Sequence, residues 1–391
     1  MKLFVLLSRV PYPLEKGDKL RAYHLVKRLA QRHDIFLCCL SDQPVAPGAV
    51  EHLRGFCQHI EVVHLPRWRI VLKLANAVFT RLPFQVSYFH HTAAQRQVDA
   101  AIDRFKPDHI FCQLVRTTEY VRERWSLPKT LDYMDTLSKG MERRTETSSF
   151  WLRPLLRAET RRLIAYENLM FDLFDHCVII SAQDRDYLYH PGRTTMAVIP
   201  NGVDTGHFHP PTGQHEPRYD LLFTGNMNYP PNIDSVLFLA NRVLPLVRKE
   251  RPDTSLLISG VDPSARVREL AERDPLTTVT GWVKDIRASY ADARIFVAPM
   301  QIGTGLQNKL LEAMAMRMPC ITSPLANNAV GAEPGEAILI GTEPEEHARN
   351  ILHLLNSPGE RDRIAANGHR FVLRHFDWQR SADVLDALIS G

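Results

Sequence analysis

The fold is decided by the stretch Arg294-Ile295-Phe296-Val297-Ala298, which precedes Gly303-Thr304-Gly305-Leu306-Gln307-Asn308-Lys309-Leu310-Leu311-Glu312-Ala313-Met314-Ala315. The first run is apolar, as in a buried strand, and the second begins as a glycine loop and continues as a helical pattern. Such a loop leaves backbone N–H groups free at a helix N-terminus, where the helix dipole favours a phosphate. The stretch therefore predicts an anion-binding loop at the carboxyl end of a strand.

The helix in this stretch has two faces. At about 100° per residue, Asn308, Lys309 and Glu312 share one face with Gly305. A separate apolar stripe is made of Leu306, Leu310, Ala313 and Met314. A cation near the helix start and a carboxylate one turn later suit a diphosphate and the vicinal hydroxyls of a ribose, which predicts a nucleotide site. The same residues also fit a buried helix with an ordinary surface pair of Lys309 and Glu312.

Strand-like apolar runs alternate with helical patterns along all 391 residues. We expect strands near Lys2–Ser8, Ile35–Leu40, Ile60–Leu65, His109–Cys112, Lys129–Tyr133, His176–Ile180, Met196–Ile199, Leu221–Thr224, Ser255–Gly260, Thr277–Thr280, Ile295–Ala298, Cys320–Ser323 and Ala337–Ile340. This alternation is typical of parallel sheets covered by helices on both faces. We predict an α/β protein of two doubly wound, Rossmann-like domains that face a cleft, with ligands at the carboxyl ends of the strands.

The pattern restarts after Pro200-Asn201-Gly202-Val203-Asp204. The residues that follow, as far as Pro217, are rich in Pro, Gly and His, which indicates a linker. We expect a first domain over 1–200, a linker over 201–217, a second domain over 218–375, and a C-terminal helix over 376–391 that returns to the first domain.

Composition is that of a globular protein, with 45% hydrophobic and 24% charged residues and a net charge of +4. The mildly basic balance suits anionic ligands or a membrane surface, and basic residues are dispersed without a zinc-finger or RNA-binding signature, so we expect no nucleic-acid partner. Six cysteines without a C-x-x-C pair predict free thiols and a cytoplasmic location. No histidine group has metal-ligand spacing, so we expect no metal and no cofactor. No apolar run approaches the length of a transmembrane helix.

A loop after the first strand carries Lys16-Gly17-Asp18-Lys19-Leu20-Arg21. We expect Gly17, Asp18 and Arg21 to approach the donor phosphates or the acceptor, with Asp18 as the helix N-cap. A plain strand–helix turn explains the loop equally well.

Two loops of the second half are further candidates. Gly225 follows a strand and lets the backbone approach a ligand closely, with Asn226 beside it. The alternative is a proline-rich turn before a helix that Asn232 caps. Val283, in Gly281-Trp282-Val283-Lys284-Asp285, is expected to border a nucleotide base. Simple turns fit both segments as well.

Two carboxylates, Asp132 and Asp135, flank Tyr133-Met134 at the end of a predicted strand. They suit acid–base or electrostatic roles at a cleft, and Asp135 is the better candidate. The alternative is that one carboxylate caps a helix and the other is solvated.

Residues 66–81 and 150–162 combine cations, tryptophan and aliphatic side chains. Basic amphipathic helices with tryptophan suit an interface with anionic lipid, which predicts a peripheral contact at the inner face of the cytoplasmic membrane. Buried helices with an exposed basic edge remain the alternative.

The restarted α/β pattern, with Pro200–Asp204 and Leu311-Glu312-Ala313-Met314-Ala315, resembles glycosyltransferase family 4, which has the GT-B fold. More narrowly, four sets of strings resemble the sugar transferases associated with PEP-CTERM/exosortase exopolysaccharide systems. They are Arg9-Val10-Pro11-Tyr12-Pro13 with Lys16–Arg21, Glu159-Thr160-Arg161-Arg162-Leu163 with Tyr166-Glu167, Phe223-Thr224-Gly225-Asn226-Met227 with Pro231-Asn232, and Gln307-Asn308-Lys309-Leu310-Leu311-Glu312.

The resemblance implies a retaining transferase that moves a sugar from a nucleotide diphosphate sugar to a glycan or lipid-linked acceptor without a metal. Glu312 matches the second glutamate of the family's Glu-x7-Glu motif, expected at the ribose, whereas the first glutamate is replaced by Thr304. Gly225-Asn226-Met227-Asn228 stands where many members have an Arg and a Lys for the diphosphate, so Lys309 and helix N–H groups are expected to do more of this work. Asp135 stands where many members have a histidine.

The resemblance and the loops together define the expected site. The donor-binding residues are Gly225, Asn226, Val283, Gly303, Thr304, Gly305, Leu306, Gln307, Asn308, Lys309 and Glu312. Catalytic roles are expected for Asp135, Lys309 and Glu312. Two rival functions remain, a nucleotide-sugar epimerase of the same architecture and a non-catalytic nucleotide-sugar-binding subunit. A nicotinamide enzyme is disfavoured because no G-x-G-x-x-G follows the first strand.

Overall fold

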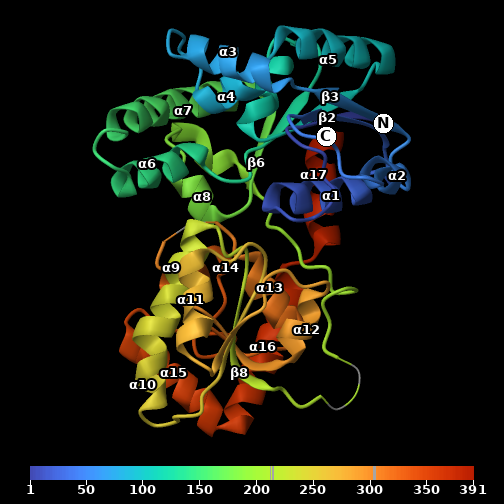
Figure 1. Cartoon of the computed structure of the whole chain (residues 1–391). Helices are drawn as coiled ribbons and strands as arrows, with labels where there is room; N and C mark the ends of the chain where they lie inside the picture. Colours follow the sequence, from blue (N-terminus) through green and yellow to red (C-terminus); the bar gives the residue numbers. More distant parts are fainter. Residues whose placement is uncertain (212, 214, 303–304) are drawn as a thin grey trace. The chain divides into compact units, whose positions relative to one another are not determined.

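The computed structural model describes residues 1–211, 213, 215–302 and 305–391. The chain divides into two compact units, Met1–Pro200 with Trp378–Gly391, and Asn201–Asp377 (Figure 1). Gly303 and Thr304, which we expect in the donor site, lie outside the described residues.

The first unit is built on a parallel sheet with the strand order β3-β2-β1-β4-β5-β6-β7. Its strands are β1 (Lys2–Leu7), β2 (Asp34–Ser41), β3 (His59–His64), β4 (His109–Gln113), β5 (Lys129–Asp132), β6 (His176–Ile179) and β7 (Ala197–Val198). Its helices are α1 (Gly17–Leu29), α2 (Ala49–Arg54), α3 (Arg67–Ala77), α4 (Phe84–Phe89), α5 (Thr92–Phe105), η1 (Val115–Tyr120), α6 (Leu137–Thr147), α7 (Arg153–Leu173), α8 (Ala182–Tyr187), η2 (Pro191–Thr195) and α17 (Trp378–Ser390). The order reverses at β1, which pairs with β2 and β4, and at such a point a crevice opens beyond the carboxyl ends of the strands.

Strand β1 shows why this sheet is covered on both faces. Successive side chains of a strand point to opposite faces. Phe4 and Leu6 pack into one hydrophobic cluster, whereas Leu3, Val5 and Leu7 pack into another on the opposite side. Burying each such side chain contributes about 1.5–3 kcal/mol, so an uninterrupted apolar run is stable only between two helical layers.

The final helix, α17, packs within the first unit although it ends the chain. Arg32 forms ion pairs with Asp383 at 2.7 Å and with Asp386 at 2.8 Å. The ring of His24 stacks on the buried ring of Trp378, with centroids 4.7 Å apart. Residues from Asn201 onward, in contrast, group with the second unit, where the Val203 N–H donates to the Phe376 carbonyl at 2.9 Å.

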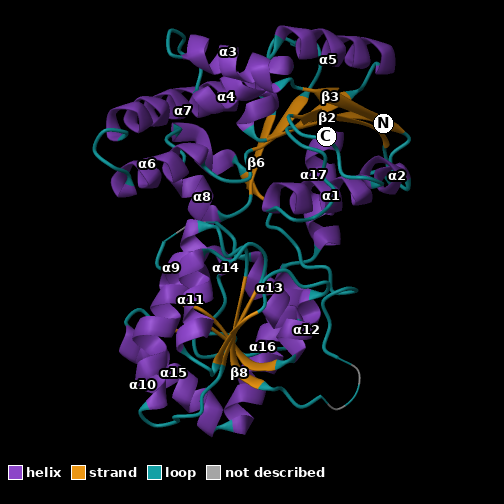
Figure 2. Ribbon diagram, in the orientation of Figure 1, coloured by secondary structure: helices purple, strands orange, loops and turns teal. Residues whose placement is uncertain are grey.

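The second unit repeats the plan with the parallel order β10-β9-β8-β11-β12-β13. Its strands are β8 (Tyr219–Thr224), β9 (Leu256–Ser259), β10 (Thr277–Val279), β11 (Ala293–Ala298), β12 (Cys320–Thr322) and β13 (Leu339–Ile340). Its helices are α9 (Pro230–Phe238), η3 (Leu239–Val243), α10 (Leu244–Arg248), α11 (Ala265–Arg273), α12 (Ile286–Ala291), α13 (Asn308–Ala315), α14 (Pro324–Val330), α15 (Pro344–Asn356) and α16 (Pro358–His375). Helices flank the strands on both sides, and the order reverses at β8, between β9 and β11 (Figure 2).

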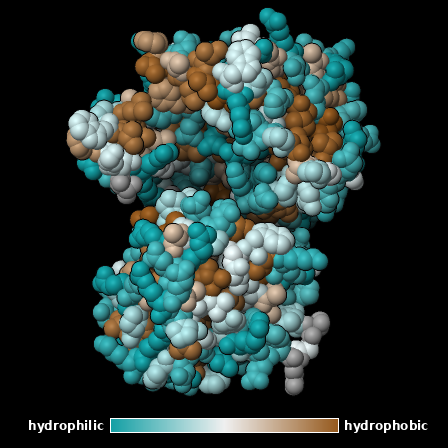
Figure 3. All heavy atoms as spheres, viewed as in Figure 1, coloured by the Kyte–Doolittle hydropathy of each residue, from teal (hydrophilic) through white to brown (hydrophobic). Residues whose placement is uncertain are grey.

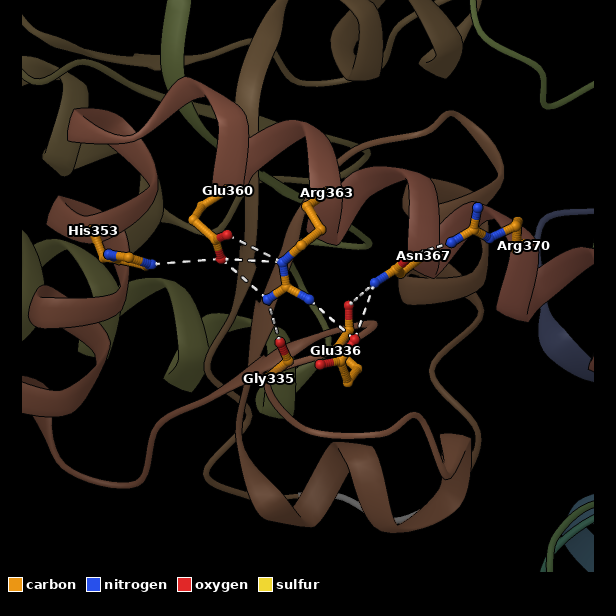
Figure 4. Close-up of polar contacts among 7 residues, drawn as sticks. All are labelled: Gly335, Glu336, His353, Glu360, Arg363, Asn367 and Arg370. Carbon is orange, nitrogen blue, oxygen red and sulfur yellow. Dashed lines mark hydrogen bonds and ion pairs between the residues drawn. The ribbon is translucent and has the colours of Figure 1, made fainter.

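A surface network fastens α16 to the segment before β13 (Figure 4). Arg363 donates to Glu336 at 3.0 Å, to Glu360 at 3.0 Å and to the Gly335 carbonyl at 2.8 Å. Asn367 adds a bond to the Glu336 carbonyl at 2.9 Å. Solvent screens these exposed charges, so the network orients the helix and contributes little to stability.

In the described part of the chain, no helix is both long enough and apolar enough to cross a bilayer.

Candidate functional site

Two glycines meet at the carboxyl edge of the second sheet. Gly225 follows β8 and Gly260 follows β9, with φ angles of +154° and +146° that side-chain-bearing residues rarely adopt. A Cβ built on Gly260 would lie 1.8 Å from the Gly225 carbonyl oxygen. The two loops therefore approach as closely as backbones allow, which requires glycine. Gly260 was not among the predicted site residues, although its place directly after a strand is the signal that singled out Gly225.

Lys309 is held by the elements around it. Its Nζ donates to Oδ1 of the buried Asn232 and lies 4.5 Å from the centroid of the Phe223 ring. Asn232 in turn donates from Nδ2 to the Asn226 carbonyl at 2.9 Å. The alternative interpretation, in which Asn232 caps the helix, was wrong, because α9 begins at Pro230 and Asn232 lies inside it. The amide instead links the Gly225 loop to the lysine.

Glu312 has a different partner. The buried Tyr290 hydroxyl donates to Glu312 Oε2 at 2.8 Å and lies 2.9 Å from Thr224 Oγ1. Lys309 and Glu312 thus each bond to other groups, so they are not the ordinary surface pair that the sequence also allowed. The sequence analysis missed Tyr290, on α12, because it is far in sequence from both Glu312 and Thr224 and no local pattern predicts the contact.

The charges of both residues are tuned by their surroundings. Burial lowers the pKa of Lys309 to about 7, and the nearby Glu312 carboxylate opposes this shift. Burial raises the pKa of Glu312 to about 7, while the Tyr290 hydrogen bond and Lys309 act in the opposite direction. An anion bound beside Lys309 would favour its protonated form.

The remaining donor-site predictions fall around this pair. Asn308 begins α13, and its Oδ1 accepts a hydrogen bond at 3.1 Å from the buried Asn201. Gln307 stands at the N-cap position without a side-chain cap bond and donates instead to the Gly305 carbonyl at 3.2 Å. Leu306 packs against the core of the unit. The first N–H groups of α13 therefore have no side-chain cap from Gln307.

The loop after β10 also lies at this edge. Gly281, with a φ of +69°, follows β10, and its carbonyl accepts from the Gly260 N–H at 3.2 Å. Trp282 is 71% exposed, and Val283 beside it is partly buried. Asn226 is exposed, so the loops after β8 and β10 both present side chains to solvent.

In the first unit, the loop predictions require correction. Helix α1 begins at Gly17 with Lys16 at the cap position, so Asp18 is not the N-cap. Asp18 instead accepts from Arg9 Nη1 at 2.5 Å, and its carbonyl accepts from Gln113 at 3.2 Å. Asp18 therefore joins the loop after β1 to the end of β4.

Arg21 does not face a ligand, contrary to expectation. Its Nε and Nη2 donate to Asp132 at 2.6 and 3.1 Å, and both side chains are 0% exposed. A third bond runs from Nη1 to the Ile199 carbonyl at 2.7 Å. The role considered for Asp132 at a cleft is likewise wrong, because its carboxylate is fully buried and also accepts from the Met134 N–H at 3.1 Å.

Asp135, in contrast, is exposed. It lies near Arg116, which the sequence analysis did not single out. Arg116 lies in η1 after β4 and donates to Gln85 Oε1 at 2.7 Å. Although the side chain of Asp135 keeps contact with solvent, desolvation by the surrounding protein raises its pKa, and the Arg116 charge opposes this shift. Burial lowers the pKa of Arg116, and the charge of Arg9 adds to that effect. The carboxylates of Asp135 and Asp18 oppose the lowering of the Arg116 pKa, so two cations and two carboxylates share this region.

The backbone around these residues is strained. Leu114 follows β4 with a φ of +64°, and Met134 follows β5 with a φ of +61°. Non-glycine residues at positive φ cost of order 1–3 kcal/mol each and cluster at functional sites. Arg116 and Asp135 follow the carboxyl ends of β4 and β5, close to β1, where the strand order reverses.

Comparison with known proteins identifies similar sequences for the second unit and for the whole chain. Residues 218–357 match the family model described as Glycosyl transferases group 1. An uncharacterized 44.6 kDa protein in the cps region of Klebsiella pneumoniae is 22% identical, with 96% of each chain aligned.

Solved structures confirm the predicted fold class. Sucrose-phosphate synthase from Thermosynechococcus elongatus superposes with a TM-score of 0.74 at 15% identity, over 99% of this chain and 98% of that chain. Anabaena HepE, in complex with UDP, superposes with a TM-score of 0.70 at 14% identity over the full length of both chains. The chain thus has the two-domain GT-B fold, and its second unit carries the sequence pattern of the group 1 glycosyl transferases over residues 218–357.

Proposed function

We propose that this protein is a retaining glycosyltransferase that moves a sugar from a nucleotide diphosphate sugar to a glycan or lipid-linked acceptor. The observation that carries the proposal is the arrangement of Lys309 and Glu312 at the carboxyl edge of the second sheet, each oriented by a buried partner. The match of the same unit to the group 1 family and the UDP bound by HepE support it.

In this proposal the second unit binds the donor. Lys309 and the N–H groups at the start of α13 neutralise the diphosphate, and Glu312 accepts hydrogen bonds from the ribose hydroxyls. The exposed face of Trp282 and the adjacent Val283 border the base. Charge develops on the diphosphate as the sugar leaves, so donors placed there before reaction lower the barrier. These groups make a metal unnecessary, and we propose that none is used.

The first unit binds the acceptor in this proposal. Arg9 and Arg116 lie after β1 and β4, the pair of strands at which the order reverses. Two cations at this place suit an acceptor that carries a phosphate, as a lipid-linked glycan does. Asp135 lies within the field of Arg116 and is positioned to orient the acceptor hydroxyl.

A role in exopolysaccharide or related surface-glycan synthesis is the biological context that we propose. The gene product from the cps region of Klebsiella pneumoniae is similar over nearly its whole length. The resemblance of the loops to exopolysaccharide sugar transferases points to the same context.

The test is a donor screen followed by a transfer assay. A thermal-shift panel of UDP-, GDP- and ADP-sugars identifies the donor, because a ligand of the folded state raises the melting temperature. Release of the nucleoside diphosphate is then measured with and without candidate acceptors. A new nucleotide sugar formed without acceptor would favour the epimerase, and donor binding without any turnover would favour a non-catalytic subunit.

Variants locate the site. Lys309→Ala and Glu312→Gln are expected to reduce transfer at least about a hundredfold, the scale on which single charge-stabilising donors act. Lys249→Ala, an exposed lysine at the end of α10, is the matched control. Turnover at the wild-type rate in Lys309→Ala would contradict the assignment.

A further inference from the structure

Large apolar side chains are exposed on two segments of the first unit. The segment of α3 and the turn after it exposes Trp68, Val71, Leu72, Val78 and Phe79. The second segment, at the start of α7, exposes Phe150, Trp151, Leu152 and Leu155. Phe79 is 88% exposed and Trp151 is 78% exposed, so these are unpartnered surfaces and not edges of the core.

Hydrogen bonds join the two segments into one surface. Arg162 of α7 donates to the carbonyls of Ala77 at 2.8 Å and Val78 at 3.1 Å, which end α3. Glu159, also on α7, accepts from the backbone N–H groups of Phe84 at 2.8 Å and Gln85 at 3.2 Å. We call residues 66–81 with 148–162 the α3–α7 surface. In the space-filling view, apolar side chains gather over α3 (Figure 3).

Every exposed charge on the α3–α7 surface is positive. Residues 66–81 contain no aspartate or glutamate, and residues 148–162 contain one, Glu159. Glu159 is only 3% exposed and is used by the backbone of α4. The cations are Arg67, Arg69, Lys73, Arg81, Arg153, Arg157, Arg161 and Arg162. The guanidinium of Arg69 lies 5.0 Å from the centroid of the Trp68 ring, so aromatic and cationic groups are interleaved.

This charge pattern selects the partner. A second copy of the chain docked face to face would place the eight cations opposite like charges. The neighbouring carboxylates of Glu142 and Glu146 already line a cavity with Arg153, Arg157 and Arg161. An anionic bilayer offers phosphate groups to the cations and an acyl boundary to the apolar side chains. Tryptophan is favoured at that boundary. Helix α3 has 11 residues, too few to span the bilayer, so it would lie in the plane of the interface.

We propose that the α3–α7 surface docks this protein on anionic lipid bilayers. Docking does not depend on catalysis. It bears on the proposed function in one respect, because a docked protein would encounter a lipid-linked acceptor at the bilayer. Trp68 and Trp151 insert at the boundary between headgroups and acyl chains, with the cations around them at the level of the phosphates.

Vesicle flotation tests the proposal with the full chain. We expect binding to phosphatidylglycerol–phosphatidylcholine vesicles, none to pure phosphatidylcholine, and weaker binding at about 0.5 M than at about 0.05 M salt, because salt screens the headgroup charge. The double variant Phe79→Ser/Trp151→Ser should lose binding at least about tenfold. Arg67→Gln/Arg153→Gln should weaken binding and flatten the salt dependence.

The control is Trp125→Ser, which removes a tryptophan that is 69% exposed elsewhere on the first unit. It should bind vesicles like the wild type. Quenching by brominated lipid provides a second readout, since it should affect Trp68 and Trp151 and leave the buried Trp378 unchanged. An unchanged melting temperature and donor-induced thermal shift in the double variant would show that folding and donor binding are intact.

Three outcomes would overturn the proposal. They are the absence of flotation at low salt, equal binding by the wild type and the Phe79→Ser/Trp151→Ser variant, and a dimer in sedimentation that this variant abolishes. The last result would assign the α3–α7 surface to a second copy of the chain. None of them bears on sugar transfer to a water-soluble acceptor, so the proposed function is judged separately.

Discussion

Lys309 Nζ donates a hydrogen bond to Asn232 Oδ1, and this bond joins α13, the helix after β11, to α9, the helix after β8. The two residues are 77 positions apart in sequence. Because β8 and β11 are neighbours in the sheet, their following helices start side by side, and a lysine on one can be oriented by an amide on the other. The bond holds the Lys309 ammonium near the carboxyl ends of β8 and β11, where the strand order of the second sheet reverses.

Asn232→Ala is therefore expected to weaken donor binding about tenfold, because a hydrogen bond to a charged group is worth about 1.5–3 kcal/mol. Isothermal titration with the donor nucleotide measures this change. Asn228→Ala, an exposed asparagine in the same loop, should bind like the wild type. Equal affinity in both variants would show that Asn232 does not position Lys309.

The pKa values of Lys309 and Glu312, each about 7, predict a pH optimum for donor affinity near neutrality. Above it Lys309 loses the proton that attracts the diphosphate, and below it Glu312 gains a proton and loses its acceptor charge. Tyr290→Phe removes a bond that lowers the Glu312 pKa, so the acid limb should move to higher pH. Donor affinity measured across pH checks both statements, and an unmoved acid limb would count against the Tyr290 role.

Gly260→Ala should destabilise the second unit by about 3 kcal/mol or more, since its Cβ would overlap the Gly225 carbonyl and the φ is unfavourable. Urea unfolding followed by circular dichroism measures the loss. Gly359→Ala is the control, because a Cβ there meets nothing within 4 Å. Similar midpoints for the two variants would refute the close approach of the loops.

Arg21→Ala should cost about 3–5 kcal/mol, because it leaves the carboxylate of Asp132 buried without its partner. Replacing both residues, as in Arg21→Met/Asp132→Leu, should recover much of this loss. Donor-induced thermal shifts should survive in the double variant, since neither residue reaches solvent. A selective loss of donor binding would instead support the phosphate role first expected for Arg21.

Arg116→Gln should raise the KM for a phosphate-bearing acceptor about tenfold and leave the affinity for the donor unchanged, because it removes a charge-assisted bond of about 1.5 kcal/mol on the first unit. Steady-state kinetics with both substrates varied separates the two effects. Arg104→Gln, with a side chain that is 63% exposed in an ion pair with Glu61, is the matched control. An increase in the donor KM alone would contradict the assignment.

The strands could be predicted because buried parallel strands are continuous apolar runs, and each of the runs, from Lys2–Ser8 to Ala337–Ile340, overlaps an observed strand. The restart after Pro200 likewise coincides with the division into units. Loop roles were less predictable: Asp18 and Arg21 are neighbours on α1, yet one joins Arg9 near the surface and the other enters the core. The sequence shows that a helix contains charged residues, but it does not show whether each side chain faces solvent or the core.

By itself, the sequence determined the parallel α/β architecture and its two units, because hydrophobic periodicity acts locally, and it placed Lys309 and Glu312 on one face of a helix. Only the tertiary structure decided that Asn232 and Tyr290 orient that pair, that Gly260 meets Gly225, and that the charges of Arg9 and Asp135 act on Arg116. These relationships depend on the order of strands in each sheet, which sets which loops become neighbours. That order results from the packing of whole layers, and no short stretch of the chain carries it.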